Sequence, residues 1–148
     1  MIKFDSAQPY IDCLAVFRKG NKVAFVLREN TGWMDGMYGL PGGKVEKGES
    51  FTAGIIRETK EEVGVDLKPE QLKQVMTVYR RSDDMDWVGV WFEVGQWDGE
   101  LFNAEPQMHT KLDWLDLDEL PENMIPYLRY CFEQIKDGNN YAEYGWES

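Results

Sequence analysis

The sequence predicts an α/β fold in which helices pack against a mixed β-sheet, and three observations support this prediction. Several short apolar runs rich in valine and phenylalanine are typical of strands, one long amphipathic segment follows a glycine-rich loop, and a second helical segment lies near the carboxyl end. The 148 residues are 43% hydrophobic and 14% aromatic, which suits one folded domain with a single core. We expect residues 1–136 to form that domain. Residues 137–148 are expected to be an aromatic tail, docked on this domain or on a second subunit.

The strands are expected in the first third of the chain and again between residues 74 and 115. Residues 11–18 and 22–28 are apolar runs separated by a Lys-Gly-Asn turn, which predicts a hairpin with both strands largely buried. Residues 29–48 contain six glycines and are predicted to be a loop with a short strand at 37–40. Further strands are expected at residues 74–80, 87–94 and 112–115.

Two helices are expected. Residues 50–63 have helical periodicity, and Gly64 follows where a left-handed residue would end the helix. Residues 125–135 form the second predicted helix, with Pro126 in its first turn, where proline is favoured.

The charge balance excludes several classes of partner. The chain has 16 Lys and Arg against 27 Asp and Glu, a formal net charge of −11, which disfavours nucleic-acid binding. No apolar run approaches the roughly 20 residues needed to span a bilayer. Residues 1–10 include Asp5 and lack the apolar core of a signal peptide. We therefore expect a soluble, cytoplasmic protein with no membrane or nucleic-acid partner.

Cysteine and histidine usage excludes several kinds of site. Cys13 and Cys131 lie far apart without metal-ligand spacing, which indicates buried thiols in a reducing compartment. His109 is the only histidine, so metal sites that need two histidines are excluded.

The helix predicted at residues 50–63 carries a concentration of acids. At about 100° per residue, Glu58, Glu61 and Glu62 share one face, whereas Thr59 points towards the core. Like charges at this spacing cost roughly 0.2–0.5 kcal/mol per pair, so a plain charged stripe is the weaker interpretation. A bound divalent cation would turn the repulsion into ligation, and oxygen ligands suit Mg²⁺ or Mn²⁺.

The loop before this helix is close to the phosphate-binding P-loop pattern but departs from it at one position. Glu49 stands where that pattern requires lysine. Because an acid would repel phosphate there, phosphate is expected to bind through the metal. Glu49 and backbone carbonyls of the loop would complete the metal site.

The spacing of these residues is similar to a known signature. All seven fixed positions of the Nudix box match: Gly43, Glu49, Arg57, Glu58, Glu61, Glu62 and Gly64. The chain therefore resembles the MutT-like Nudix hydrolases, and the likeness covers about residues 10–136. Thr59 departs from the usual apolar residue, which bears on packing and leaves the carboxylates unchanged.

The resemblance implies an α/β/α sandwich with a mixed sheet, Mg²⁺ dependence, and attack of water on a phosphorus of a diphosphate bridge. It implies that Glu58, Glu61 and Glu62 are metal ligands together with the carbonyl of Gly43. Arg57 would orient the acids, with support from Glu49. The proton of the water would go to Glu61 or to a carboxylate outside the box, for which the candidates are Glu93, Glu100 and Glu105.

Residues outside the box are candidates for substrate contacts. Arg28, beside the glycine loop, either binds phosphate or is an ordinary surface arginine. Trp33, Tyr38, Trp87 and Trp91 either stack on a nucleobase or pack in the core.

The favoured function is hydrolysis of a (d)NTP or a modified nucleotide. The alternatives are a nucleotide-sugar pyrophosphatase of the ADP-ribose type, a Nudix-like module that binds a nucleotide without cleaving it, and an acidic interaction domain with no site. The oligomeric state, including a homodimer, is open from the sequence.

Overall fold

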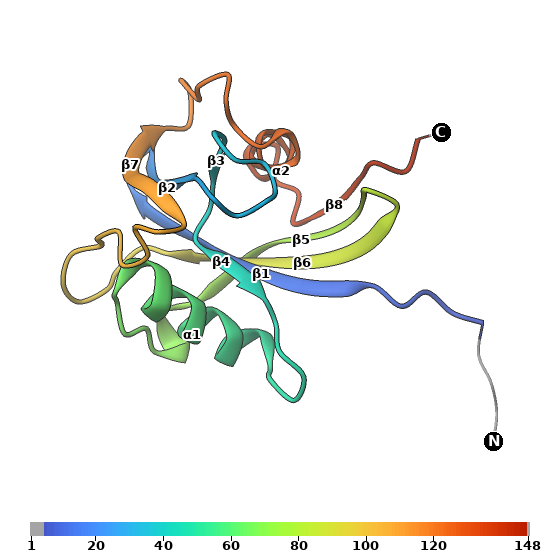
Figure 1. The fold of residues 1–148 in the computed structure, drawn as a ribbon, viewed down its shortest axis with the longest axis horizontal. Helices are drawn as coiled ribbons and strands as arrows, with labels where there is room; N and C mark the ends of the chain where they lie inside the picture. Colours follow the sequence, from blue (N-terminus) through green and yellow to red (C-terminus); the bar gives the residue numbers. More distant parts are fainter. Residues whose placement is uncertain (1–4, 148) are drawn as a thin grey trace.

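A mixed β-sheet lies between two helices in the computed structural model, which describes residues 5–147 (Figure 1). The outer ends of the two predicted ranges, residues 1–4 and 148, lie outside the described residues. The elements in chain order are β1 (Tyr10–Lys19), β2 (Lys22–Arg28), β3 (Tyr38–Gly39), β4 (Gly42–Lys44), α1 (Phe51–Val63), a 3₁₀ turn (Pro69–Gln71), β5 (Lys73–Ser82), β6 (Met85–Val94), β7 (His109–Asp116), α2 (Pro126–Lys136) and β8 (Tyr141–Tyr144).

The sheet has the order β3-β2-β1-β6-β5-β8, and β4 and β7 pair with β1 and β2. β1 runs parallel to β6, with Asp12 opposite Gly89, and β5 runs parallel to β8. The other pairs are antiparallel. The predicted α/β class with a mixed sheet is therefore confirmed.

Helix α1 covers one face of the sheet. Ser50 caps it, because the Ser50 hydroxyl accepts a hydrogen bond from the Ala53 amide at 3.0 Å. Gly64 ends it in a left-handed conformation with φ of 75°. Thr59 is fully buried, as expected, and its hydroxyl donates to the Ile55 carbonyl at 2.7 Å, so its polar group is satisfied within the helix.

Helix α2 covers the opposite face (Figure 1). Its side chains pack against fully buried Trp91, whose ring meets Phe132 edge-on at 5.2 Å. Cys131 lies in this layer and Cys13 in the layer under α1. Both thiols are free, and burial raises the pKa of each to about 12, so neither is a ready nucleophile.

Two strands were not predicted from the sequence. β4 lies in a glycine-rich segment that has no side-chain alternation. β8 lies in the aromatic tail and adds to the edge of the sheet, where Tyr141 is opposite Thr77. Trp146 follows and donates its indole N–H to the Tyr79 carbonyl at 2.9 Å. This part of the tail is therefore packed on its own chain.

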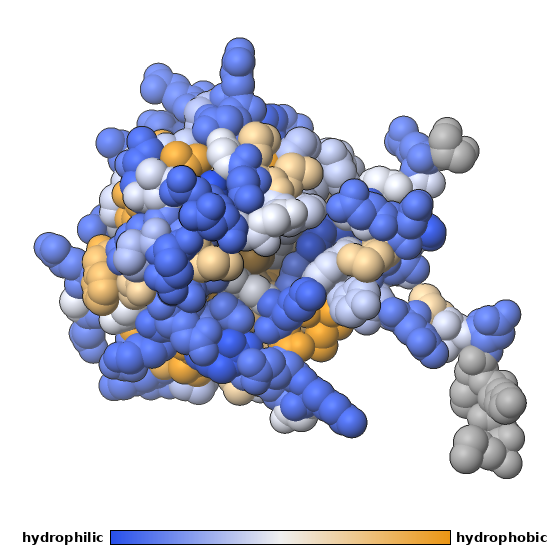
Figure 2. Space-filling view, in the orientation of Figure 1, coloured by the Kyte–Doolittle hydropathy of each residue, from blue (hydrophilic) through white to orange (hydrophobic). Residues whose placement is uncertain are grey.

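The surface is mostly hydrophilic in the view of Figure 2, with small and separate apolar areas. Among residues 5–147, every helix is too short or too polar to cross a membrane.

Candidate functional site

The glycine loop lies directly against α1. The Gly42 amide donates to the Glu62 carboxylate at 2.8 Å. At Gly43, an added Cβ atom would lie 2.8 Å from the Glu58 carboxyl carbon, a distance at which one of the two must move. The loop therefore needs glycine here for its backbone to reach the carboxylates.

Arg57 joins the loop to the helix. Its guanidinium binds both oxygens of Glu49, with Nε and Nη2 at 2.8 and 2.9 Å. Nη1 reaches Glu58 at 2.9 Å and Glu61 at 3.4 Å, and Nη2 donates to the Lys44 carbonyl at 3.1 Å. A fixed fork of five donors suits this role, because it orients several acids at once.

The acids of this group differ in their ionisation. The hydrogen bonds from Arg57 lower the pKa of Glu49 to about 2. Burial raises the pKa of Glu62 well above its ordinary value of 4.5, although the Gly42 amide opposes the shift. Burial also raises the pKa of Glu58, against the effect of Arg57. Two carboxylates on α1 are thus held in a place that disfavours their charge.

The three carboxylates of α1 are divided between two partners. Glu62 faces the loop amide, whereas Glu58 and Glu61 face Arg57. Within residues 5–147, no three acidic, histidine or cysteine side chains already converge on a point that would hold a metal ion. The donor set nevertheless suits a hard cation, since carboxylate oxygens lie beside the backbone of Gly43, where an added Cβ atom would collide with Glu58.

A cavity of about 400 Å³ begins at this loop. Its lining joins Gly42, Gly43 and Arg28 to a second charged group that contains Asp12 and Arg80. Its size is in the usual range for small-molecule sites.

Arg28 and Trp33 lie in the lining of this cavity. The Arg28 guanidinium donates to the Trp33 carbonyl and to Thr31, both at 2.9 Å, and lies 5.1 Å from the Trp33 ring centre. Burial lowers the pKa of Arg28, and the charge of Glu62 opposes this shift. The Arg28 cation is therefore held in place within the electrostatic field of Glu62.

The other aromatic candidates separate into two groups. Trp87 lines the cavity and is half-buried. Trp91 is fully buried in the core. Tyr38 is 7% exposed and donates its phenol O–H to Asp113, and the structure places it outside the cavity lining.

Three acids outside the Nudix-box spacing were candidates for accepting the proton of the attacking water. Glu93 is paired with Arg18 at 3.3 Å, on the sheet, and Glu100 is exposed. Glu105 lies in the segment after β6, which is bound to the end of α1 by a hydrogen bond from the Ala104 amide to the Glu62 carbonyl at 2.9 Å. Burial raises the pKa of Glu105, and the charge of nearby Glu61 adds to the shift. The structure thus brings Glu105, of the three, to the acids of α1.

Asp12 and Arg80 are the residues that sequence reasoning missed. They form an ion pair with Nη2 to Oδ2 at 2.6 Å, and the two residues are only 7% and 5% exposed. The sequence contained one signal for them: in each strand, a charged residue stands at a position whose side chain faces the core.

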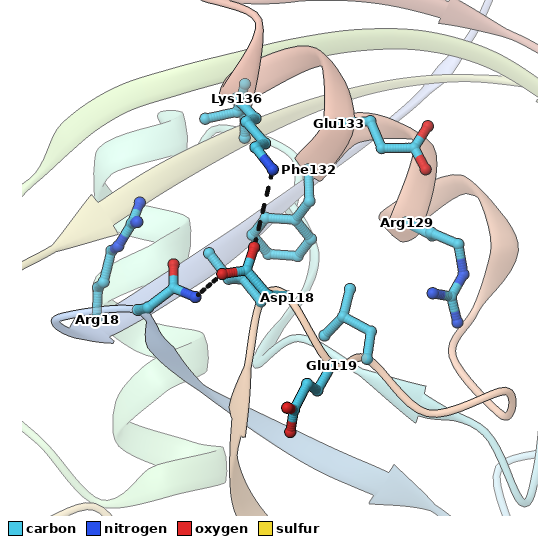
Figure 3. A pocket seen from close by; sticks show the side chains of 11 residues that line it. Arg18, Asp118, Glu119, Arg129, Phe132, Glu133 and Lys136 are labelled. Carbon is cyan, nitrogen blue, oxygen red and sulfur yellow. Dashed lines mark hydrogen bonds and ion pairs between the residues drawn. The ribbon is translucent and has the colours of Figure 1, made fainter.

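A larger cavity of about 600 Å³ lies elsewhere, between α2, the end of β1 and the segment after β7 (Figure 3). All of its cationic side chains have partners in the protein, since Arg18 pairs with Glu93. Lys136 lies 3.8 Å from Asp118, and Arg129 donates to the Pro121 carbonyl. Its lining contains residues of α2 and of the loops, and not of α1, so it is separate from the box acids.

Comparison with known proteins identifies the family. The family model described as the NUDIX domain matches residues 7–135. The chain belongs to the Nudix family. The crystal structure of a MutT NUDIX hydrolase from Burkholderia pseudomallei is 29% identical, covers 86% of this chain and 98% of that one, and superimposes with a TM-score of 0.78.

Two curated Nudix relatives are also similar. The "Uncharacterized Nudix hydrolase YvcI" of Bacillus subtilis is 31% identical over 71% of this chain and 65% of its own length. The ADP-ribose pyrophosphatase of Methanocaldococcus jannaschii is 29% identical over 77% of this chain and 66% of its own length. The chain therefore spans slightly less than two thirds of each of these Nudix proteins.

Proposed function

We propose that this Nudix protein hydrolyses the diphosphate bridge of a small nucleotide, a (d)NTP or a modified nucleotide, with the help of a divalent cation. One observation carries the proposal. The box acids on α1 adjoin, through the glycine loop, a cavity whose size suits one nucleoside.

Glu58, Glu61 and Glu62 would hold the cation together with the carbonyl of Gly43, with Mg²⁺ as the first choice and Mn²⁺ as the second. When bound, the cation neutralises phosphate charge and lowers the pKa of a bound water. Arg57 positions Glu58 and Glu61 by its hydrogen bonds. Glu49 in turn holds Arg57 by a two-point contact.

Arg28 supplies a second positive charge for the substrate. It lines the cavity, and its guanidinium is fixed by Thr31 and by the Trp33 carbonyl. A planar, fixed guanidinium is well suited to a phosphate oxygen. Trp33, whose ring lies beside Arg28, offers an apolar wall for the nucleoside.

The proton of the attacking water has two candidate acceptors. Glu61 is about half exposed on α1, and Glu105 reaches the same acids from the segment after β6. Burial raises the pKa of Glu105, and a raised pKa makes a carboxylate a stronger base. This argument favours Glu105.

The ADP-ribose pyrophosphatase among the relatives supports one alternative, hydrolysis of a nucleotide sugar. The two functions differ in what occupies the site beyond the diphosphate.

A substrate panel tests the proposal. The protein is incubated with nucleoside triphosphates and with ADP-ribose, in Mg²⁺, in Mn²⁺ or in EDTA, and the products are separated by ion-exchange chromatography. We expect cation-dependent cleavage with nucleoside triphosphates as the better substrates. Preference for ADP-ribose would establish the alternative, and the absence of turnover on every nucleotide would refute hydrolysis.

A further inference from the structure

A buried ion pair forms part of the cavity wall. Asp12 comes from β1 and Arg80 from β5, and these strands lie on either side of β6. The pair passes over β6 at Gly89, where an added Cβ atom would lie 2.5 Å from Asp12 Oδ1 and 3.1 Å from Arg80 Nη1. Glycine at this position therefore leaves room for the pair.

Stability alone does not account for this pair. Buried ion pairs are often no more stabilising than apolar residues of similar volume. A guanidinium has five N–H donors. Among the described residues, the Arg80 side chain makes two hydrogen bonds, and both go to Asp12, at 2.6 and 3.4 Å. The buried Nε has no partner there. Nε is closed off from the cavity, but Arg80 lines the cavity, and Nη1 and Nη2 each keep one N–H beyond the bond to Asp12 that a ligand can use.

The surroundings of the pair define the shape of the ligand. The Arg80 guanidinium lies 4.3 Å from the Tyr127 ring centre and 5.2 Å from that of Trp87. Trp87, Leu14 and Leu128 also line the cavity. These flat and apolar walls suit a planar group such as a nucleobase.

The charge of the pair defines the chemistry of the ligand. Asp12 and Arg80 together carry no net charge, so they do not attract phosphate as Arg28 does. They present a cationic donor beside an anionic acceptor. The base edge that matches this arrangement has a carbonyl oxygen next to a ring N–H, as in a lactam. Arg80 then donates to the carbonyl oxygen and Asp12 accepts from the ring N–H, so both hydrogen bonds are charge-assisted. In the same pose an amino base turns an amine donor towards Arg80 and an unprotonated ring nitrogen, which is an acceptor, towards Asp12, so neither hydrogen bond forms.

We propose that Asp12 and Arg80 are specificity-determining residues that select nucleobases with a lactam edge, such as hypoxanthine, guanine and uracil, over the amino bases adenine and cytosine. This inference rests on the proposed function, because it assigns the base end of the same substrate site.

The sharpest test compares dITP with dATP, since their bases differ only at this edge. We expect kcat/KM in Mg²⁺ to be about 10-fold or more higher for dITP, the discrimination usual for two directed contacts to a base. The double variant Asp12→Leu with Arg80→Met removes the pair without leaving a buried charge unpaired. In this variant we expect hydrolysis to continue, with a dITP to dATP ratio near one.

Arg81→Met is the matched control, because Arg81 follows Arg80 on β5 but is 44% exposed and pairs with Asp86. Its ratio is expected to equal that of the wild type. Calorimetric binding of dIMP and dAMP to the wild type measures the same preference without hydrolysis. Equal turnover of dITP and dATP, or a ratio unchanged in the double variant, would overturn the inference while leaving hydrolysis intact. Tighter binding of dIMP without any turnover would overturn the proposed function and retain the inference.

Discussion

Two arginine-centred clusters lie at the site, and they differ in their balance of charge. Arg57 donates hydrogen bonds to the carboxylates of Glu49, Glu58 and Glu61 and lies 3.8 Å from that of Glu46, so one cation serves four acids. Arg80 contacts Asp12, and the charges of that pair cancel. A cluster with excess negative charge can bind a cation, whereas a neutral pair of one donor and one acceptor suits an uncharged ligand. In the proposed function, the cluster on α1 serves the phosphate end of the substrate and the pair on the sheet serves the base end.

Both clusters also depend on a glycine. An added Cβ atom at Gly43 would lie 2.8 Å from Glu58, and one at Gly89 would lie 2.5 Å from Asp12. Each glycine belongs to a strand that passes beneath the acid. The two clusters can therefore be disturbed separately by the same chemical change.

The largest effect is expected from Glu58→Gln. This change removes one negative charge from the cluster on α1, because a neutral amide replaces the carboxylate that Arg57 positions. We expect kcat/KM in Mg²⁺ to fall by about 100-fold or more for every nucleotide, since cation-assisted stabilisation is worth several kcal/mol. Steady-state kinetics at saturating Mg²⁺ measures the change.

Glu46→Gln provides the control for that variant. Glu46 lies 3.8 Å from Arg57, but its side chain is 68% exposed. Its neutralisation is expected to change kcat/KM by less than about 3-fold, because exposed ion pairs contribute roughly 0–1 kcal/mol. Equal losses in the two variants would show that the cluster on α1 has no special role.

The next effect separates the two glycines. Gly43→Ala is expected to lower kcat/KM for all nucleotides by about 10–100-fold, as for other changes that displace the groups supporting a metal site. Gly89→Ala is expected to reduce the dITP to dATP ratio instead. Both variants are expected to lose about 1–3 kcal/mol of unfolding free energy, the usual cost of overpacking. Urea denaturation and the same kinetics measure these changes.

Gly95→Ala is the matched control, because an added Cβ atom there meets no atom within 4 Å among the described residues. It is expected to match the wild type in both kinetics and stability. A loss of selectivity in Gly43→Ala, or a uniform loss of rate in Gly89→Ala, would contradict the division into two ends.

The cluster on α1 was accessible from the sequence because it is local. A helix places residues three and four apart on one face, so Glu58, Glu61 and Glu62 could be grouped without a structure. The place of Gly43 beside these acids was predicted through the resemblance to the Nudix box, whose spacing the sequence matches. Burial of Glu62 was not predicted, since it depends on the Gly42 amide that β4 brings to it.

The cluster on the sheet was not accessible, because it depends on the pairing of distant strands. Asp12 meets Arg80 only because β1 runs parallel to β6, with Asp12 opposite Gly89. Such a register cannot be read from the periodicity of any one strand. The aromatic residues show the same limit, since Trp33 lines the cavity and Tyr38 does not.

Gly54 shows a limit of the helical wheel. The wheel places Gly54 beside the acidic face of α1, but the residue is buried, and an added Cβ atom would lie 3.1 Å from Glu49 Oε1 and 3.4 Å from Cys13 Sγ. The loop and β1 fill the space that the helical wheel alone shows as empty.

The smallest effect concerns the stability of the protein without a divalent cation. Burial raises the pKa of Glu62 above its ordinary value of 4.5. Above pH 4.5 the unfolded chain therefore ionises this group while the folded protein retains the proton. The free energy of unfolding then falls as the pH rises, until the pKa of the folded state is passed. Glu62→Gln retains an acceptor for the Gly42 amide without the charge. In EDTA at pH 8 we expect it to be more stable than the wild type by about 1–3 kcal/mol, with a smaller change between pH 5 and pH 8.

Glu61→Gln is the control, since Glu61 lies on the same helix with its side chain 53% exposed. It is expected to change the unfolding free energy in urea by less than about 0.5 kcal/mol at either pH. A Glu62→Gln variant that is less stable than the wild type at pH 8 would mean that the buried charge already has a sufficient partner in the protein. Greater stability of Glu62→Gln alone would instead show that α1 holds a charge that the protein does not balance, which is the property that distinguishes this cluster from the neutral pair of Asp12 and Arg80.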